Sequence, residues 1–370
     1  MQMNVASLSP PWVYSEAEEI SEVVVDIKAS KTEAFVLPLW YGSYEFPKAD
    51  TSYPAETISK RAEVVRAKDL VILPNHVLVH SKTNELQSYT FMRNRKFHHG
   101  GVKLLEDGTY RPKYKIQKLP TVKYDFPVYH ADTDHPEVYG HVLLEALSSL
   151  WATELVREKD VRIITSVKPT PGYRSMFRSL GISDERLIHL KGAAYTSEAY
   201  LPGKIIQRRR FIDPIARSVY DRMGGMLSWR SDLSPFERIY ISRSKVSGRK
   251  LVNEQEVEGM FSDLGFAIIH PQELSIFDQV KLFSSAKFIA GSGGSAIHNV
   301  LFSRDDCKVL ILSSIGWVVV ADALICQVPG QLGYVFGAPP IMPPDTHRTQ
   351  ADWHIEMKEV RAAVKEHFGI

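Results

Sequence analysis

The stretch that most constrains the fold of this chain is KFIAGSGGSAIHNVLF, residues 287–302. Its apolar run Phe288–Ala290 has the length of a short buried strand. A turn of small residues, Gly291–Ser295, follows, and apolar residues then recur at helical spacing. Strand, glycine turn and helix in this order bring backbone N–H groups and a helix N-terminus towards an anion, usually a phosphate. A tight turn without a ligand fits the same residues equally well, so the neighbouring segments decide between the two interpretations.

From residue 126 onwards, segments with the pattern of a strand alternate with segments that have the period of a helix. This alternation indicates an α/β fold with parallel sheets that are covered by helices. Apolar runs predict strands at 22–27, 34–39, 69–73, 76–80, 128–131, 161–166, 186–190, 238–242, 266–270 and 308–312. Amphipathic stretches predict helices at 137–156, 173–180, 214–227, 253–264, 276–286 and 352–368. Residues 92–125 are expected to form a surface hairpin or loop.

The length of the chain indicates more than one domain, since 370 residues are many for a single core. Residues 193–210 lack a helical period, contain Pro202-Gly203 and end in three arginines, so we interpret them as an interdomain connection. The resulting prediction is an N-terminal domain over 1–200, a C-terminal domain over 205–350 and a last helix within 351–370.

Composition excludes several classes of function. The net charge of +2 is too small for a general nucleic-acid binder. Cys307 and Cys326 have no metal-binding or CxxC spacing and fit reduced thiols in a cytosol. The N-terminus does not resemble a secretory signal, and no apolar stretch has the length of a transmembrane helix. We therefore expect a cytoplasmic protein whose association with a membrane is at most peripheral.

Polar residues follow the predicted strands at several places. Arg243 comes directly after the strand 238–242, where a guanidinium can bind a diphosphate as a forked donor, although a solvated basic loop is an equally good interpretation. His141 and Glu145 stand at i and i+4 on one helix face and could form a base with its orienting partner. A His–Glu hydrogen bond without a function is the more common case. His298 and Asn299 follow the glycine turn on the first turn of its helix.

The segment Asp132-Thr133-Asp134 contains an Asp-x-Asp pattern, which can chelate Mn²⁺ or Mg²⁺ against a diphosphate. The pattern is weak and lies in a loop rich in proline and histidine. Histidines 98, 99, 130, 135 and 141 have no metal-ligand spacing such as HExxH, so a zinc site is not expected. We predict no metal.

Together these segments resemble the glycosyltransferase family 61, whose members are common in bacterial capsule and exopolysaccharide clusters. The matching motifs are YGHVLLE at 139–145, YISR at 240–243 with Arg249 and Asn253-Glu254, the helix and flanks within 265–286, and GSGGSAIHN at 291–299. The resemblance covers roughly residues 126–312. Eukaryotic members usually carry a histidine where this chain has Gly293, and residues 1–125 match no known pattern.

The resemblance implies a GT-B-like architecture, in which two Rossmann-like domains with parallel sheets face a central cleft. The N-terminal domain would bind the acceptor, a glycan or lipid-linked saccharide, and the C-terminal domain would bind a nucleotide-sugar. The last helix can pack back on the N-terminal domain in such proteins. The implied reaction is an inverting, metal-independent transfer in surface polysaccharide synthesis, in the cytoplasm or at the inner face of the membrane. The nucleotide-sugar is a co-substrate, and no cofactor is expected.

The resemblance also suggests roles for individual residues. His141 is the expected base for the acceptor hydroxyl, Glu145 orients it, and Asp132 or Asp134 could substitute. Without a metal, the leaving diphosphate needs arginines and backbone N–H groups at a helix N-terminus. The predicted donor-binding residues are Arg243, Arg249, Ser292, Gly293, Gly294, Ser295, His298 and Asn299.

Two other functions fit the same sequence. A nucleotide-sugar epimerase of similar build would need a second acid or base in the donor cleft and no acceptor. A non-catalytic protein could bind sugar nucleotides or assist assembly. The donor sugar, the nucleotide, the acceptor, the linkage and the oligomeric state do not follow from the sequence.

Overall fold

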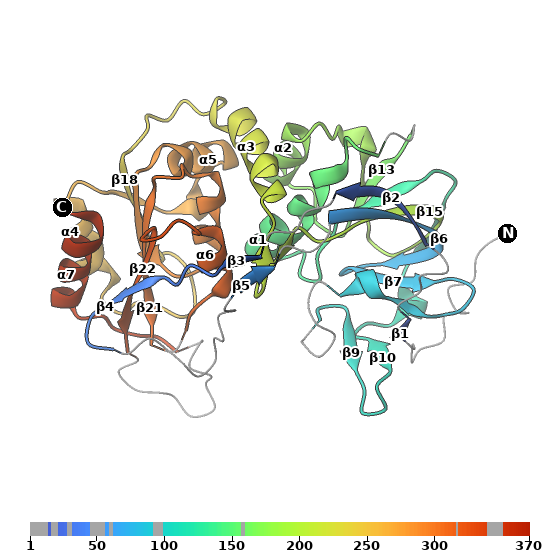
Figure 1. Cartoon of the computed structure of the whole chain (residues 1–370), viewed down its shortest axis with the longest axis horizontal. Coiled ribbons are helices and arrows are strands. Elements are labelled where there is room, and N and C mark those ends of the chain that lie inside the picture. The colour runs from blue at the N-terminus through green and yellow to red at the C-terminus, as the bar shows by residue number, and fades with distance from the viewer. Residues whose placement is uncertain are drawn as a thin grey trace. The chain divides into compact units, whose positions relative to one another are not determined.

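The structure, a computed structural model, describes residues 14–15, 21–27, 32–44, 56–58, 62–91, 99–156, 160–315, 317–338 and 351–370. The chain divides into two compact units, whose elements are shown in Figure 1. The first unit comprises 1–31, 58–207 and 211–219, and the second comprises 32–57, 208–210 and 220–370. The sequence analysis had assigned residues 32–57 to the N-terminal domain, whereas the structure groups them with the second unit.

The second unit contains a six-stranded sheet in which every pair of neighbouring strands is parallel. Its order is β19 (Ala267–Ile269), β18 (Arg238–Ile241), β20 (Phe288–Ser292), β21 (Lys308–Ser314), β22 (Leu332–Gly337) and β4 (Leu39–Tyr41). The five strands from β18 to β22 thus have the order 2-1-3-4-5 of a doubly wound fold, and the order reverses between β18 and β20. A parallel, Rossmann-like sheet was predicted for this part of the chain.

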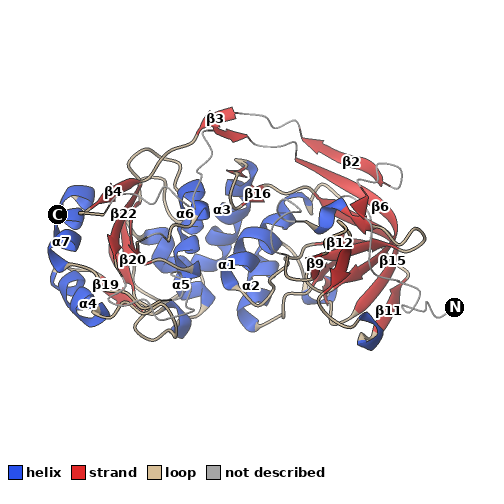
Figure 2. Ribbon diagram, turned by 90° about the horizontal axis from the view of Figure 1, so that it is seen from below, coloured by secondary structure: helices blue, strands red, loops and turns tan. Residues whose placement is uncertain are grey.

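Helices cover both faces of this sheet, as Figure 2 shows. One face carries α4 (Glu254–Asp263) and α7 (Met357–Phe368), and the other carries α5 (Ile276–Ser285) and α6 (Val320–Ile325). Val364 and Phe368 of α7 are buried in one core cluster with Phe288 and Leu310 of the sheet. The last helix therefore packs in the second unit, whereas the resemblance suggested that it packs back on the N-terminal domain. Its apolar residues pack against one face of the parallel sheet within their own unit.

The first unit contains a ten-stranded sheet that is mixed, so the prediction of parallel sheets in both domains is wrong for this unit. β12 (Val128–His130), β13 (Arg162–Thr165) and β14 (Leu187–His189) are parallel. β6 (Ala62–Leu73) pairs antiparallel with β2 (Ser21–Ile27), β7 (Val77–His80) and β15 (Ala193–Pro202). The remaining strands are β1 (Tyr14–Ser15), β8 (Leu86–Gln87) and β11 (Thr121–Tyr124). β6 and β7 are antiparallel because a tight turn joins them.

β15 corrects the prediction that residues 193–210 connect two domains. It is a central strand that pairs with β6 over eight residue pairs and with β11 and β12 in parallel. Its buried side chains include Ala193, Ala194 and Ala199. Alanine contributes little to an apolar pattern, and this strand is recognisable only when its neighbours are known. The predicted strand 34–39 is also wrong, since β3 (Thr32–Ala34) and β4 are separated by irregular residues.

The predicted helix 137–156 is a helical run of mixed type. An α-helical turn, α1 (Tyr139–His141), leads into a π-helical segment (Val142–Leu147) and a 3₁₀ segment (Ser148–Ala152). π-Helical segments widen a helix by one residue and occur frequently at functional sites. No helix among the described residues is long and apolar enough to cross a membrane.

The other short elements complete the chain. They are α2 (Pro171–Ser179), α3 (Ile215–Ser228), the strands β5 (Glu56–Ile58), β9 (Val102–Leu104), β10 (Tyr110–Pro112), β16 (Ile206–Gln207) and β17 (Phe211–Ile212), and 3₁₀ turns at Ser88–Thr90, Ile116–Lys118, Asp184–Arg186, Pro271–Glu273 and Ser295–Phe302. The hairpin β9–β10 lies in the region predicted to be a surface hairpin or loop.

Candidate functional site

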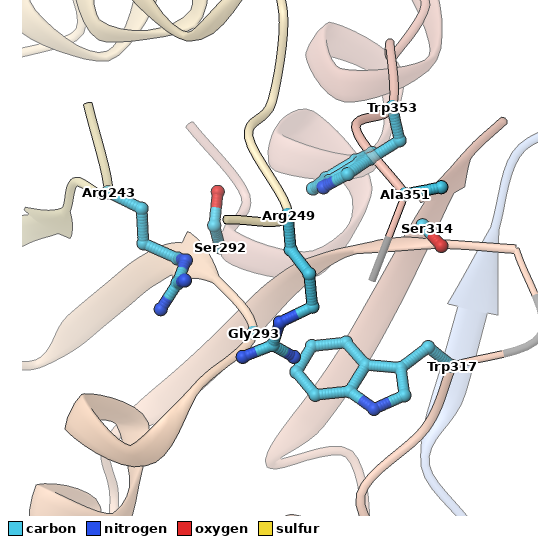
Figure 3. A pocket seen from close by; sticks show the side chains of 8 residues that line it. All are labelled: Arg243, Arg249, Ser292, Gly293, Ser314, Trp317, Ala351 and Trp353. Atoms are coloured by element: carbon cyan, nitrogen blue, oxygen red, sulfur yellow. The ribbon is translucent and has the colours of Figure 1, made fainter. Parts of the chain in front are cut away.

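The carboxyl ends of β18 and β20 are neighbours at the point where the strand order of the second sheet reverses. Ligands of doubly wound proteins bind at this point, because helices leave in opposite directions and open a crevice. A pocket lies there, and Figure 3 shows the side chains that line it. They belong to Arg243, Arg249, Ser292, Gly293, Ser314, Trp317, Ala351 and Trp353.

Two half-buried arginines give this pocket its charge. The guanidinium carbon of Arg249 lies 4.0 Å from the centre of the Trp317 ring (Figure 3). Burial and the charge of Arg243 lower the pKa of Arg249 to about 10, and burial also lowers the pKa of Arg243. Both side chains remain cationic at neutral pH. Two cations this close to each other create a local positive potential, which a bound anion would neutralise.

The glycine turn after β20 must stay free of side chains because the pocket residues approach it closely. A Cβ atom on Gly293 would lie 2.9 Å from the Trp317 ring, and one on Gly294 would lie 2.8 Å from Nη1 of Arg243. The N–H group of Gly293, however, donates to the carbonyl of Leu312 at 2.9 Å. Because this N–H group is used in the sheet, it cannot also bind an anion. The N–H groups of Gly294 and Ser295 are then the expected anion donors of the turn. The helix that follows, Ser295–Phe302, is of the 3₁₀ type.

Glu254 is a site residue that the sequence analysis quoted within a motif but did not place in the site. It is buried at the first turn of α4, and its carboxylate accepts hydrogen bonds from Tyr240 Oη (2.8 Å), the Arg243 N–H (3.2 Å) and Ser292 Oγ (3.3 Å). Burial raises the pKa of Glu254. The carboxylate thereby connects the ends of β18 and β20 and binds the backbone of Arg243.

The pocket wall formed by residues 351–355 comes from a distant part of the sequence. Asn253 holds it with both ends of its amide, since Nδ2 donates to the Ile355 carbonyl (2.9 Å) and Oδ1 accepts from the Ile355 N–H (3.2 Å). The Lys250 N–H also donates to Asp352 at 2.7 Å. These bonds place Trp353 at the pocket. Neither Trp317 nor Trp353 was predicted, because no local pattern connects them with the strand ends.

His298 and Asn299, which were predicted to bind the donor, do not line the pocket. Both side chains are buried. His298 Nε2 lies 3.2 Å from the Asp322 carboxylate of α6, and Asn299 Nδ2 donates to Gln279 of α5 at 3.2 Å. In this arrangement the two side chains fasten the 3₁₀ helix to the helices beside it.

A second polar cluster lies in the first unit, after the carboxyl end of β12. His141 Nδ1 is 3.0 Å from Glu145 Oε2 and 3.6 Å from Asp134 Oδ1, and Thr133 Oγ1 donates to the same Glu145 oxygen at 2.6 Å. Burial alone would lower the pKa of His141, but Asp134 and Glu145 outweigh it and raise the pKa to about 9. The predicted His–Glu pair is therefore formed, and Asp134 joins it.

Asp132, the third predicted catalytic residue, lies apart from this pair. Its carboxylate is fully buried and accepts hydrogen bonds from the Ser166 N–H (2.9 Å) and Ser166 Oγ (2.7 Å). Burial raises its pKa to about 6. Its Oδ2 lies 3.8 Å from Nε2 of His130. Asp134, two residues further along the chain, is the aspartate that reaches His141.

Two groups of residues in the first unit could each hold a metal ion, although the sequence analysis predicted none. In His76, His130 and Asp132, one possible ligand atom of each residue, a ring nitrogen or a carboxylate oxygen, lies within 4.8 Å of the other two. The same holds for Asp134, His141 and Glu145. Both groups combine residues that are distant in sequence or separated by irregular intervals. A search for fixed ligand spacing therefore could not find them.

Residues 139–310 match the family model described as Glycosyltransferase 61. The matched segment begins at α1 and ends within β21, and it contains every predicted site residue except Asp132 and Asp134. A comparison with curated proteins found no match.

Proposed function

We propose that this chain, which belongs to the glycosyltransferase 61 family through its residues 139–310, transfers a sugar from a nucleotide-sugar to a glycan or lipid-linked acceptor with inversion at the anomeric carbon. The observation that carries the proposal is the pairing of Arg243 and Arg249 with a glycine turn at the reversal point of a parallel sheet. A diphosphate is the common ligand for such an arrangement. Synthesis of a surface polysaccharide, in the cytoplasm or at the inner face of the membrane, is the setting we propose.

The donor side of the reaction needs positive charge where the leaving diphosphate accumulates negative charge. The two guanidinium groups can supply it, together with the N–H groups at Gly294 and Ser295. The stacking of Arg249 on Trp317 supports this role, because it holds the guanidinium in one orientation before the ligand arrives. Since these groups are cationic without a metal, we propose that transfer is metal-independent. Loss of transfer in EDTA, with recovery in Mn²⁺, would contradict this part of the proposal.

The acceptor side needs a base. In the proposed reaction the acceptor oxygen attacks the anomeric carbon, the bond from that carbon to the diphosphate oxygen breaks, and the acceptor proton moves to His141. Glu145 fixes the ring through Nδ1. The raised pKa of His141, about 9, means that the neutral base is a minor form at pH 7 and becomes the major form in alkaline solution. A GT-B-like arrangement of the two units is part of the same proposal.

The experiment that tests the function separates donor binding from turnover. We would first screen nucleotides and UDP-, GDP- and CMP-linked sugars by thermal shift, with and without Mn²⁺, because a ligand at about 100 times its dissociation constant stabilises a protein by roughly 2.7 kcal/mol. Arg243→Ala should then weaken binding of the donor that was found, and His141→Ala should keep binding and lose transfer. Lys245→Ala is the control, since this exposed lysine on the same loop pairs with Glu273.

The outcome also separates the other two functions. An epimerase would convert the nucleotide-sugar without any acceptor. A non-catalytic protein would bind the donor, and neither variant would change any transfer activity. Binding without transfer to any glycan or lipid-linked acceptor would contradict the proposed function.

A further inference from the structure

The first unit contains a group of three buried residues that the proposed reaction does not use. His76, His130 and Asp132 are 6%, 2% and 0% exposed, and they come from the β6–β7 turn, the end of β12 and the segment after it. The two imidazole rings lie with their centroids 4.6 Å apart. Buried imidazole nitrogens normally have a hydrogen-bond partner, because each is a polar group removed from water.

The hydrogen bonds of His76 determine which of its ring nitrogens carries the proton. Nε2 lies 2.7 Å from the carbonyl oxygen of Tyr89, and because a carbonyl can only accept, Nε2 is the donor. Nδ1 of the neutral ring is then a lone-pair nitrogen. Among the described residues this atom has no hydrogen-bond partner, although it is buried. A histidine whose far nitrogen donates to a carbonyl is the usual form of a metal-bound histidine.

His130 also has a buried ring nitrogen without a partner among the described residues. Its Nε2 is buried and has no hydrogen-bond partner within the described part of the chain. It lies 3.8 Å from Asp132 Oδ2, which is too far for a hydrogen bond.

The backbone adds a further observation. His76 has φ of 59° and follows Asn75 with φ of 62°, so two consecutive residues adopt the left-handed conformation. Glycine is favoured at such positions, and a side chain there carries a conformational cost that is often associated with a function. Asp132 is oriented towards His76 as well, since the His76 N–H donates to its Oδ2 at 3.3 Å.

We propose that His76, His130 and Asp132 bind one divalent transition-metal ion, with Zn²⁺ as the best match. Imidazole and carboxylate ligands without a thiolate suit Zn²⁺, and Fe²⁺, Ni²⁺ and Cu²⁺ are the competing ions. The ion joins the β6–β7 turn to the end of β12 and to the segment that leads to Asp134. The proposal does not depend on the transferase reaction.

The test uses the full chain without a histidine tag. After dialysis against metal-free buffer, elemental analysis should find about one ion per chain, because one chain supplies all three ligands. Removal of the ion with a chelator should lower the melting temperature by several degrees, and added Zn²⁺ should restore it. A Co²⁺-loaded sample should show visible absorption bands, which report the ligand set directly.

His76→Asn and His130→Gln are the informative variants, because asparagine tolerates the left-handed backbone and both side chains remain polar. Each should lose the bound ion and the Co²⁺ bands. His99→Gln is the matched control. His99 is also a buried histidine of this unit, but Nε2 contacts the Thr90 carbonyl at 3.0 Å and Nδ1 accepts from the Gly101 N–H at 3.0 Å. Its variant can lose stability but should keep the ion.

Two results would overturn the proposal. One is wild-type protein that contains no stoichiometric metal and, after incubation with Zn²⁺, Fe²⁺, Ni²⁺ or Cu²⁺, binds none and shows no change in melting temperature. The other is unchanged metal content in both His76→Asn and His130→Gln. If either variant fails to fold, the wild-type measurements decide alone. Transfer activity is not a readout here, so the proposed function can fail while the metal site stands, or the reverse.

Discussion

Arg249 stacks on Trp317, with its guanidinium carbon 4.0 Å from the centre of the ring. The backbone of Arg249 has φ of 50° and follows Gly248 with φ of 75°, so this contact is made from a left-handed turn. A non-glycine residue in this conformation is held there by its surroundings, and the ring of Trp317 is the flat surface that receives it.

We expect Trp317→Ala to lower the affinity for the nucleotide-sugar about tenfold, because a desolvated cation–π contact contributes about 1–2 kcal/mol to the orientation of the guanidinium. Calorimetric titration of the donor measures the loss. Trp229→Ala is the control, since that tryptophan is 74% exposed and lies outside the pocket. Equal donor affinities for Trp317→Ala and wild type would remove Trp317 from the donor site.

Two glycines near the pocket should respond differently to alanine. Gly294→Ala brings a Cβ within 2.8 Å of Arg243 Nη1, and a flexible side chain can move away at little cost in stability. Gly291→Ala brings a Cβ within 2.6 Å of the Ile241 carbonyl oxygen, which the sheet cannot move. We therefore expect Gly294→Ala to weaken donor binding and to fold normally. Gly291→Ala should lower the free energy of unfolding by about 2–3 kcal/mol. Urea unfolding of both variants checks this, and equal stability losses would contradict it.

Glu254→Ala should be among the most destabilising substitutions in the second unit. It leaves the Tyr240 hydroxyl, the Arg243 N–H and the Ser292 hydroxyl without their common acceptor. Loss of a shared buried acceptor costs about 2–4 kcal/mol. Urea unfolding measures the change in the free energy of unfolding. Glu256→Ala is the matched control, because Glu256 is an exposed residue in the same helical turn and its loss should change stability by less than about 0.5 kcal/mol.

His141 should make stability depend on pH. Its pKa rises from 6.5 to about 9 on folding, so its contribution is complete below pH 6.5 and is lost as the pH rises through 9. The full contribution is at most about 3 kcal/mol. We expect His141→Gln to be less stable than wild type at pH 6 and to approach it near pH 10, as measured by urea unfolding. A difference that stays constant over this range would show that the two carboxylates do not hold a proton on His141.

The pH dependence of transfer tests the role of His141 separately. If the imidazole is the base, kcat/KM rises about tenfold per pH unit below the pKa and levels off near pH 9. Activity that instead falls above pH 9 would indicate that the protonated form is required, and His141 would then act as an acid or as a cation. Steady-state assays at saturating donor and varied acceptor distinguish the two profiles.

Much of the second unit could be predicted from the sequence. The strands at 238–242, 266–270 and 308–312 and the helices between them have strong local periods, and the structure contains all of them within a few residues. The pairing of Arg243 with the glycine turn also followed, because both come at the carboxyl ends of parallel strands. His141 and Glu145 could be paired for a different reason, since the i and i+4 spacing on a helix brings them together.

The rest depended on contacts between distant residues. β15 was not predicted because its alanines are recognisable as strand residues only from their position between β6 and β12. This strand makes the sheet of the first unit mixed, since it pairs antiparallel with β6 and parallel with β12. Glu254 stood in a recognised motif, yet its role depends on Ser292, which is 38 positions away. His76 and His130 meet through a turn and a strand end that no spacing rule connects. Local sequence thus determined the elements and the residue types at their ends, because periodicity and turn chemistry act over a few residues. Only the tertiary structure decided which side chains share a buried site. Burial brings together polar groups from remote segments, and these groups must then form hydrogen bonds with one another because water is excluded.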